Sequence, residues 1–295
     1  MKTSSNHSFA AESHGDGPAR LRCGFTLAEL LVVLATLALL TALVLPAMAG
    51  TQPRSKAFQC LNHMRQLALA WTLYAGENNE RLVLNSDPHV AGTYLFGGVP
   101  SWATGSEDWS AGQQNTNEAY VSDNRFSSLA NFLANSPTVF ACPAENQISP
   151  TQRAIGWDHR ARSTSMNGAI GEGNKYEQPG PPFGWAQWYV AKKSTDFRTP
   201  TPAQTWVFTD EHPDSIDDIL MYVAPFPTTT FVELPGNQHD GAAGINFADG
   251  HADLHQWKGS VLPKQPVKFV VTQQVSCLTT DPDMLWLSQH TPQAP

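Results

Sequence analysis

Charged side chains are scarce in this chain of 295 residues, since Asp, Glu, Lys and Arg together make up only 15% of it. Basic residues are the scarcer kind, with 18 Lys and Arg against 26 Asp and Glu, so the formal net charge is −8. Without a basic excess the chain has little with which to displace the counterions of a phosphate backbone. This composition argues against a general nucleic-acid binder.

Cysteine is also rare, and its four copies are too few for a small disulfide scaffold. The sequence contains no C-x-x-C pair, which excludes a zinc ribbon and a thioredoxin-like motif. It contains no G-x-S-x-G motif either, so nothing supports a Ser-His-Asp hydrolase. A mean hydropathy of −0.30 excludes a protein with many membrane spans.

A long apolar run is present at residues 25–49, with a single charge, Glu29, near its start. Because a helix rises 1.5 Å per residue, about 20 apolar residues cross a bilayer, and residues 30–49 are just long enough. The polar residues 1–24 before the run include basic side chains, which keep that end in the cytoplasm. Two ordinary interpretations compete here, a cleaved secretory signal and a permanent anchor.

The start of this run carries a family resemblance. The segment Gly24-Phe25-Thr26-Leu27-Ala28-Glu29, followed by the apolar run, resembles the processing signal of type IV prepilins and type II secretion pseudopilins. The resemblance implies that a prepilin peptidase cuts after Gly24 and methylates the new amine of Phe25. Glu29 and Pro46 match a glutamate and a proline of those families.

Glu29 has a physical role under this resemblance. In a fibre of packed N-terminal helices, its carboxylate can pair with the freed amine of Phe25 in a neighbouring subunit. A pair of this kind in a low-dielectric bundle specifies register more than it adds stability.

After the apolar run the pattern becomes amphipathic from residue 52 to residue 76, which predicts a helix that ends at Gly76. Its apolar stripe consists of Ala57, Leu61, Met64, Ala68, Trp71 and Ala75. One continuous helix from the apolar run is the preferred interpretation, and a separate helix after a break near Pro53 is the alternative. In either case the stripe is a docking face for a globular domain.

Beyond residue 77 short β-prone runs alternate with turn residues, which indicates one β-rich domain with long loops. The expected strands are 81–84, 138–141, 185–191, 205–209, 219–223, 229–234, 243–248 and 251–257. Asp249-Gly250 between two alternating runs predicts a two-residue hairpin loop with Ala248 opposite His251. This register puts Ile245, Phe247, Ala252 and Leu254 on one apolar face and Asn246, His251, Asp253 and His255 on the other.

The same segment carries a second resemblance. His239 followed after nine residues by Asp249-Gly250 resembles the H-X9-DG signature of prepilin-type processing-associated proteins. Further segments that resemble this family are Cys60-Leu61-Asn62, Phe140-Ala141-Cys142-Pro143, Ser165-Met166-Asn167-Gly168 and residues 209–215. The resemblance implies a class of protein and a cellular location, but it implies no chemical reaction.

Metal-ligand residue types gather near the hairpin. The candidate ligands are His239, Asp249, His251, Asp253 and His255, with Asp210, Glu211 and His212 upstream. Zinc takes histidine, cysteine or carboxylate ligands and calcium takes several oxygens, so either ion is a candidate. The simpler alternative, which we prefer here, is that Asp249 is a turn residue and the other hairpin residues form a solvated polar face.

The cysteines divide according to processing, because Cys23 leaves with the leader. Three remain, so they cannot all pair within one chain. Cys60 and Cys142 both lie in segments that resemble the family, which makes them the preferred disulfide and leaves the fate of Cys277 open.

Taken together, these features predict an α+β, pilin-like fold in which a long N-terminal α-helix, membrane-spanning in its first half, packs on an antiparallel β-sheet domain with long loops. The expected segments are a leader at 1–24, a transmembrane and assembly helix at 25–49, its amphipathic continuation at 50–76 and a periplasmic domain at 77–295. The expected function is a pilin-like or pseudopilin-like fibre subunit, which is not an enzyme. Its expected partners are the prepilin peptidase, other such subunits and the inner-membrane assembly machinery.

The resemblance also implies a location, a single pass through a bacterial inner membrane with the N-terminus cytoplasmic. Two other functions stay open: a tethered periplasmic module that binds a glycan or a divalent cation, and, as the weakest, an anchored metal hydrolase. Trp185 and Trp188 are the residues that would stack on a glycan, although packing in a core or interface is the preferred interpretation of these tryptophans.

Overall fold

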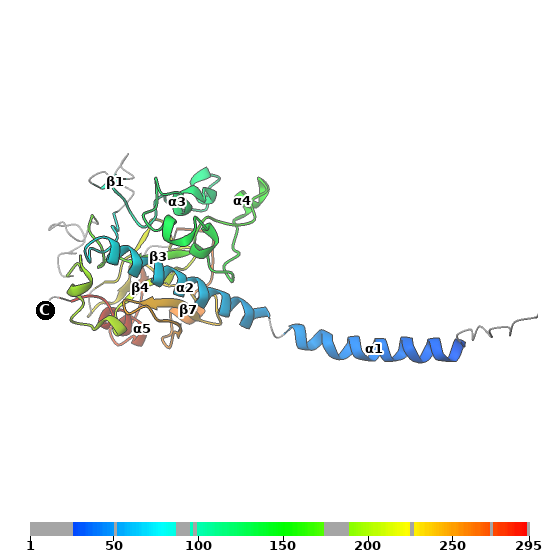
Figure 1. The fold of residues 1–295 in the computed structure, drawn as a ribbon. Coiled ribbons are helices and arrows are strands. Elements are labelled where there is room, and N and C mark those ends of the chain that lie inside the picture. The colour runs from blue at the N-terminus through cyan, green and yellow to red at the C-terminus, as the bar shows by residue number, and fades with distance from the viewer. Residues whose placement is uncertain are drawn as a thin grey trace, which may run out of the picture. The chain divides into compact units, whose positions relative to one another are not determined.

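The computed structural model describes residues 26–49, 52–86, 95–96, 99–173, 189–224, 227–271 and 274–293. The chain divides into two compact units, residues 1–50 and residues 51–295, which are described separately below. Figure 1 shows both units and labels the helices and some of the strands.

Two helices occupy the N-terminal part of the chain where one long helix was expected. Helix α1 (Leu27–Ala49) belongs to the first unit, and helix α2 (Gln52–Glu77) belongs to the second. Pro53 lies in the first turn of α2, where its missing N–H costs no helical hydrogen bond. The prediction of one continuous helix is therefore wrong, and the alternative with a break near Pro53 describes the structure.

The expectation of a membrane-spanning helix is also contradicted. In the described part of the chain, no helix combines the length and the apolar character that crossing a membrane requires. This finding overturns the predicted transmembrane segment at 25–49 and, with it, the predicted location as a single-pass inner-membrane protein.

A five-stranded sheet forms the centre of the second unit. Its strand order is β5 (Leu220–Met221), β3 (Thr164–Asn167), β4 (Trp206–Asp210), β7 (Ala242–Phe247) and β8 (Ala252–Gln256). Strands β3 and β5 are parallel, and the other neighbours are antiparallel. The sheet is thus mixed, so the predicted all-antiparallel sheet is wrong as well.

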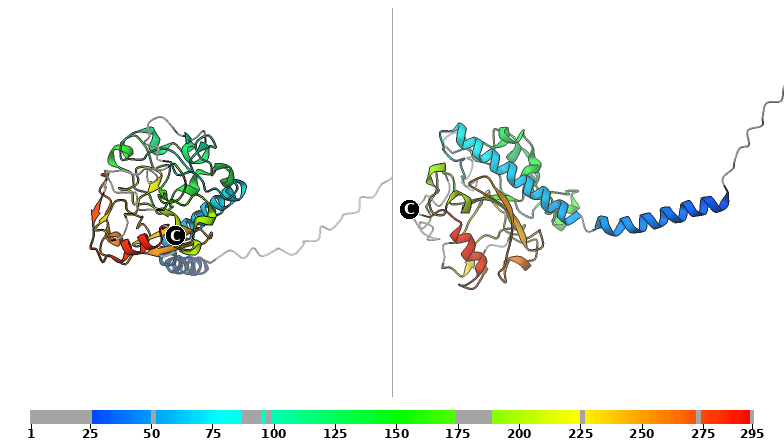
Figure 2. Two further views of the ribbon diagram at one scale, coloured as in Figure 1. Left: turned by 90° about the vertical axis from the view of Figure 1, so that its left-hand side faces the viewer. Right: turned by 60° about the horizontal axis from the view of Figure 1, so that its bottom comes forward.

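The sheet is covered on both faces, as the two views of Figure 2 show. Helix α2 packs on β4, β7 and β8 and contributes Cys60, Met64, Leu67 and Trp71 to one apolar core. Helix α5 (Pro282–Gln289) contributes Met284 and Leu287 to a second core with Ile245 and Phe247 of β7. Because both faces are buried, β7 has no solvated side, and all six of its residues are buried.

Helix α2 carries most of the predicted stripe, since Met64, Ala68, Trp71 and Ala75 are buried, whereas Ala57 and Leu61 are only half-buried. The predicted C-cap is wrong, because the helix continues through Gly76 to Glu77. The left-handed residues that follow are Asn79 and Glu80, with φ of 55° and 62°, and the Glu80 N–H donates to the Ala75 carbonyl at 2.9 Å.

The hairpin between β7 and β8 lies at the predicted place but in a different register. Asn246 pairs with Ala252 and Ile245 with Asp253, which is one residue away from the expected pairing. The loop has three residues, because the Phe247 N–H donates to the His251 carbonyl and the Gly250 N–H to the Phe247 carbonyl, both at 2.9 Å. Of the two predicted loop residues, Asp249 and Gly250, only Gly250 has a positive φ, of 97°. The predicted two-residue loop is therefore wrong.

This one-residue shift changes which side chains share a face. Phe247 stacks on His251 with ring centroids 4.2 Å apart, instead of joining Ala252 on one apolar face. Asn246 instead faces α2, where its Nδ2 donates to the Met64 carbonyl at 2.8 Å. Its Oδ1 accepts from the Phe208 N–H at 2.9 Å, at the point where the register of β4 and β7 shifts. Asn246 therefore bonds both to α2 and to the neighbouring strand β4.

The remaining elements are short. They are β1 (Leu95–Phe96), β2 (Val99–Pro100), β6 (Thr230–Phe231), β9 (Val275–Ser276), α3 (Ala119–Ser122), α4 (Pro150–Ala154) and 3₁₀ turns. The predicted strand at 138–141 is wrong, since Pro137–Phe140 forms a 3₁₀ helix. Most of the predicted strand at 185–191, including Trp185 and Trp188, lies outside the described residues.

Candidate functional site

The N-terminus of α1 is the first candidate site. Gly24 and Phe25 lie outside the described residues, whereas Thr26 and Glu29 form a capping box. The Thr26 N–H and hydroxyl donate to Glu29 Oε2 at 2.9 and 2.8 Å, and the Glu29 N–H donates to the Thr26 hydroxyl at 3.3 Å. These hydrogen bonds from Thr26 lower the pKa of the Glu29 carboxyl. Thr26 and Glu29 therefore satisfy each other's N–H groups at the start of α1.

A second candidate site lies inside the globular unit, where four side chains from distant segments meet. Cys60 comes from α2, Cys142 from the loop after the 3₁₀ helix Pro137–Phe140, Asp210 from the end of β4, and His239 from the loop before β7. Their ligand atoms all lie within 4.8 Å of one another. We call these four residues the Cys/Asp/His cluster.

The cluster is closely packed and almost fully buried. Cys60 Sγ donates to Asp210 Oδ2 at 2.9 Å, and Cys142 Sγ lies 3.2 Å from His239 Nε2. His239 Nε2 lies 4.0 Å from Asp210 Oδ2, and the two side chains are 4% and 0% exposed. Cys60 and Cys142 are buried as well. The four side chains are therefore shielded from bulk solvent.

Burial is the largest influence on the pKa of Asp210 and of His239 in the cluster. It raises the pKa of the Asp210 carboxyl to about 6, against the lowering by the Cys60 hydrogen bond. The hydrogen bond with Cys142, together with burial, raises the pKa of the Cys60 thiol. Burial lowers the pKa of the His239 imidazole. Without a cation, the cluster therefore favours neutral thiols and a neutral imidazole.

Backbone groups complete the surroundings of the cluster. The Gly244 N–H donates to Asp210 Oδ2 at 3.2 Å, and the Ala144 N–H donates to Cys142 Sγ at 3.4 Å. A Cβ at position 244 would lie 2.5 Å from Cys60 Sγ and 3.0 Å from Asp210 Oδ2. Glycine at this position in β7 therefore leaves the room that the cluster occupies.

The structure brings Cys60 and Cys142 together, as the predicted disulfide requires, but both are free thiols. Cys277 is also a free thiol. It is partly buried and packs against the second core, as Trp286 does. The sequence prediction thus placed the two cysteines side by side without their other two neighbours, Asp210 and His239.

Of the five predicted hairpin ligands, only His239 belongs to the cluster. Asp249 Oδ1 accepts from the His251 N–H at 3.1 Å and lies 2.5 Å from its Nδ1, so these two residues stabilise the turn. Asp253 is exposed at its strand position. His255 stacks on Trp286 with ring centroids 3.8 Å apart, so it belongs to an aromatic cluster and not to a solvated polar face.

The upstream residues divide in the same way. Asp210 joins the cluster, whereas the Glu211 Oε1 accepts from the Ser215 hydroxyl at 2.8 Å. His212 Nδ1 accepts from the Asp214 N–H at 3.2 Å. Glu211 and His212 therefore organise the loop after β4.

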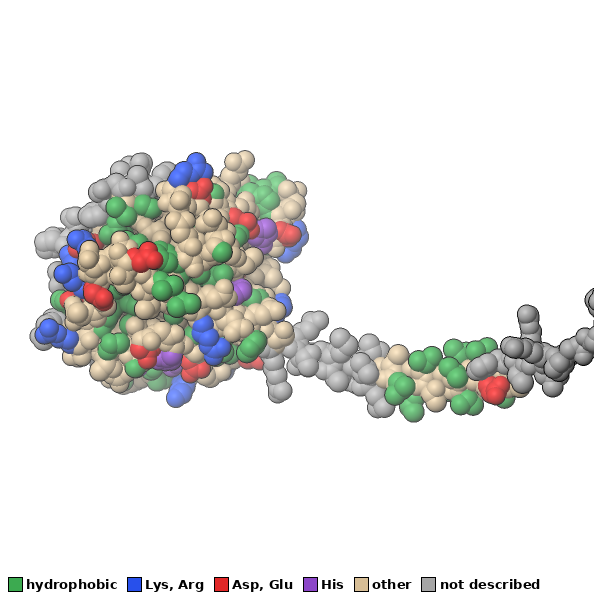
Figure 3. Space-filling model, viewed as in Figure 1, with side chains coloured by type: hydrophobic (Ala, Val, Ile, Leu, Met, Phe, Trp, Pro, Cys, Tyr) green, Lys and Arg blue, Asp and Glu red, His purple; other side chains and the backbone are tan. Residues whose placement is uncertain are grey.

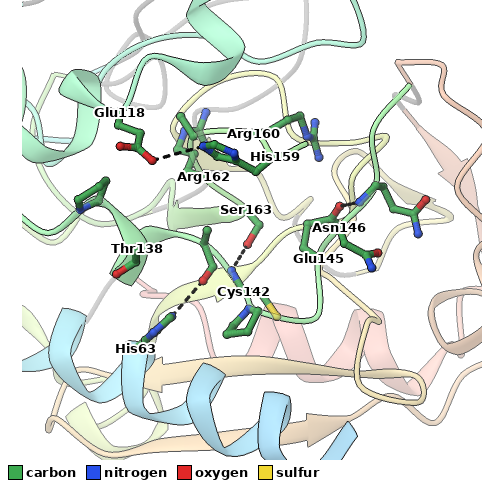
Figure 4. A pocket seen from close by; sticks show the side chains of 15 residues that line it. His63, Glu118, Thr138, Cys142, Glu145, Asn146, His159, Arg160, Arg162 and Ser163 are labelled. Carbon is green, nitrogen blue, oxygen red and sulfur yellow. Dashed lines mark hydrogen bonds and ion pairs between the residues drawn. The ribbon is translucent and has the colours of Figure 1, made fainter. Parts of the chain in front are cut away.

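A pocket of about 290 Å³ opens beside the cluster, and Cys142 forms part of its wall (Figure 4). His63 of α2 contributes from below, where its Nδ1 lies 3.0 Å from the Ala141 carbonyl. The guanidinium carbon of Arg160 lies 4.4 Å from the centroid of the Trp109 ring, and Arg160 Nη1 lies 3.8 Å from Glu107 Oε2. Sequence reasoning missed this pocket, because none of its basic residues stands in a recognisable motif.

Figure 3 shows a mixture of acidic and basic side chains on the face of the globular unit in view, without a large patch of either sign. Scattered charges of this kind do not steer a ligand of one sign. Comparison of the chain with protein-family models, with curated proteins and with solved structures finds no match in any of the three.

Proposed function

We propose that the chain is a pilin-like or pseudopilin-like fibre subunit that a prepilin peptidase cuts after Gly24 and that assembles through α1. In this proposal the chain is the substrate of an enzyme and is not itself an enzyme. Its partners are the peptidase, further copies or related subunits, and the machinery that assembles them.

The observation that carries this proposal is the apolar surface of α1. Every described side chain from residue 26 to residue 41 is exposed. The exposed large apolar residues are Leu27, Leu30, Leu31, Val32, Val33, Leu34, Leu37, Leu39 and Leu40. A helix that is apolar all round is normally buried on every side. Several copies of α1 packed into a bundle would supply this burial.

The N-terminus of α1 supports the same proposal. Residues 24–29 match the processing signal, and cleavage after Gly24 would leave the new amine of Phe25 one residue before the capping box. Glu29 is the only acidic or basic residue of α1. It could therefore cap its own helix and bind the amine of a neighbouring copy.

The test of processing is N-terminal mass spectrometry of the full chain after coexpression with a prepilin peptidase. We expect a chain that begins at a methylated Phe25, and we expect Gly24→Val to block the cut because it adds bulk next to the scissile bond. Gly17→Val, in the same leader, is the matched control and should be cut normally. An intact Met1 in the presence of active peptidase would refute the proposal.

The test of assembly uses two substitutions of Glu29. Glutamine also closes a capping box, so Glu29→Gln removes the charge and keeps the cap, whereas Glu29→Ala removes both. If the carboxylate binds a neighbouring amine, both variants should be cut normally and both should fail to form sedimentable fibres. Normal fibres from Glu29→Gln would show that Glu29 serves only as a cap, and the amine pairing would be wrong.

A further inference from the structure

Four potential metal ligands converge at one buried point of the globular unit. In the part of the chain that the structure describes, the Cys/Asp/His cluster is the only group of three or more such side chains whose ligand atoms meet. We infer that Cys60, Cys142, Asp210 and His239 bind one Zn²⁺ ion through two sulfurs, one oxygen and one nitrogen. This inference is independent of the proposed fibre assembly.

The spacing of the donors fits a tetrahedral ion. With zinc–sulfur distances of about 2.3 Å and zinc–nitrogen or zinc–oxygen distances of about 2.0 Å, ligand atoms lie about 3.3–3.8 Å apart. The distances between the ligand atoms are 2.9 Å from Cys60 to Asp210, 3.2 Å from Cys142 to His239 and 4.0 Å from His239 to Asp210. The other pairs of ligand atoms lie within 4.8 Å of each other, so shifts of about 1 Å or less would place all four around one ion.

The second carboxylate oxygen of Asp210 is an independent sign of a missing partner. Asp210 is 0% exposed, and its Oδ1 has no hydrogen-bond partner among the described residues. Its Oδ2 already accepts from Cys60 and Gly244. A buried carboxylate with an oxygen that lacks a partner is costly, and a cation bound to this carboxylate would offset that cost.

The donor set selects the ion. Two sulfurs disfavour Ca²⁺ and Mg²⁺, which take oxygen ligands, so calcium, one of the two expected ions, does not fit this site. Two cysteines with a histidine and a carboxylate in a tetrahedral arrangement suit Zn²⁺. The protein supplies all four ligands from a buried site, which is the pattern of a structural ion and leaves no open position for a substrate.

The backbone around the cluster is suited to thiolate and carboxylate ligands. The N–H groups of Ala144 and Gly244 donate to Cys142 Sγ and Asp210 Oδ2. Such second contacts orient the ligands of a metal and disperse their charge. The pocket beside Cys142 provides an entry path for the ion. In this position the ion would join α2, the loop that carries Cys142, β4 and the loop before β7.

The experiment measures zinc in the full chain purified with a reductant. We expect about one zinc per chain, and we expect cobalt in its place to give the intense visible bands of a tetrahedral ion with a thiolate charge-transfer band. Cys142→Ser and His239→Gln should each lower the zinc content about tenfold or more. Cys277→Ser, which changes a free cysteine outside the cluster, is the matched control and should retain the ion.

A ligand variant that fails to fold would leave its zinc content uninformative, so the unmodified chain is tested as well. A strong chelator should lower its melting temperature, and added Zn²⁺ should restore it, because an ion that binds only the folded state stabilises that state. Three results would overturn the inference: substoichiometric zinc, a melting temperature that neither treatment changes, or a Cys60–Cys142 disulfide in the purified chain.

Discussion

Replacing Asn246 with alanine should loosen the contact between α2 and the sheet. The side chain is 0% exposed and accepts from the Phe208 N–H at 2.9 Å while donating to the Met64 carbonyl at 2.8 Å. The substitution leaves the Phe208 N–H buried without a partner, which costs about 1–3 kcal/mol, and removes a bond worth about 0.5–1.5 kcal/mol. We therefore expect Asn246→Ala to lower the free energy of unfolding by about 3 kcal/mol.

The assay is urea denaturation followed by tryptophan fluorescence, together with the melting temperature. A loss of about 3 kcal/mol corresponds to a decrease of about 6–12 °C in a domain of this size. Gln66→Ala changes an exposed residue of α2 and is the matched control, which should stay within about 0.5 kcal/mol. If Asn246→Ala is as stable as this control, then Asn246 does not hold α2 against the sheet.

Two further predictions concern the glycines and His255. Gly250→Val should destabilise the protein by about 1–3 kcal/mol, because φ is 97° at this position of the hairpin. Gly76→Ala in α2 should instead stabilise the protein by about 0.5–1 kcal/mol, because alanine is the better helix former and its Cβ meets nothing there. Equal effects of the two substitutions in thermal denaturation would contradict this. Burial lowers the pKa of His255 from 6.5 to about 4. Between these two pH values, His255 is protonated in the unfolded chain and neutral in the folded chain. Stability should therefore fall by about 1–2 kcal/mol between pH 6.5 and pH 4, after a discount for partial exposure, and His255→Gln should remove this part of the slope in urea titrations. Parallel slopes for the two proteins would show that His255 does not contribute.

The position of the hairpin followed from its sequence, but its register did not. Alternation and Asp249-Gly250 indicate two strands and a turn, and they fit a two-residue loop and a three-residue loop equally well. The expected faces assumed one solvated side, whereas α2 and α5 cover both sides of β7. A buried Asn246 therefore looks like a surface residue until its two partners, Phe208 and Met64, are known.

All four members of the Cys/Asp/His cluster were singled out from the sequence, but under separate hypotheses. Cys60 and Cys142 were expected to form a disulfide, His239 to join the hairpin residues, and Asp210 to accompany Glu211 and His212. Sequence spacing shows which ligands share an element, but it does not show which elements meet in space. The sequence also did not predict β3 (Thr164–Asn167), because its buried residues are mostly polar and show no hydrophobic alternation.

The distances along the chain within the Cys/Asp/His cluster have a consequence for biosynthesis. Asp210 follows Cys60 by 150 residues, and His239 follows Cys142 by 97. At about 5–20 residues per second, Cys142 is made about 5–20 s before His239, and Cys60 waits still longer. During this interval both thiols lack their final neighbours and are open to oxidation or to premature pairing. The redox state of the compartment in those seconds therefore decides which thiols reach the finished protein.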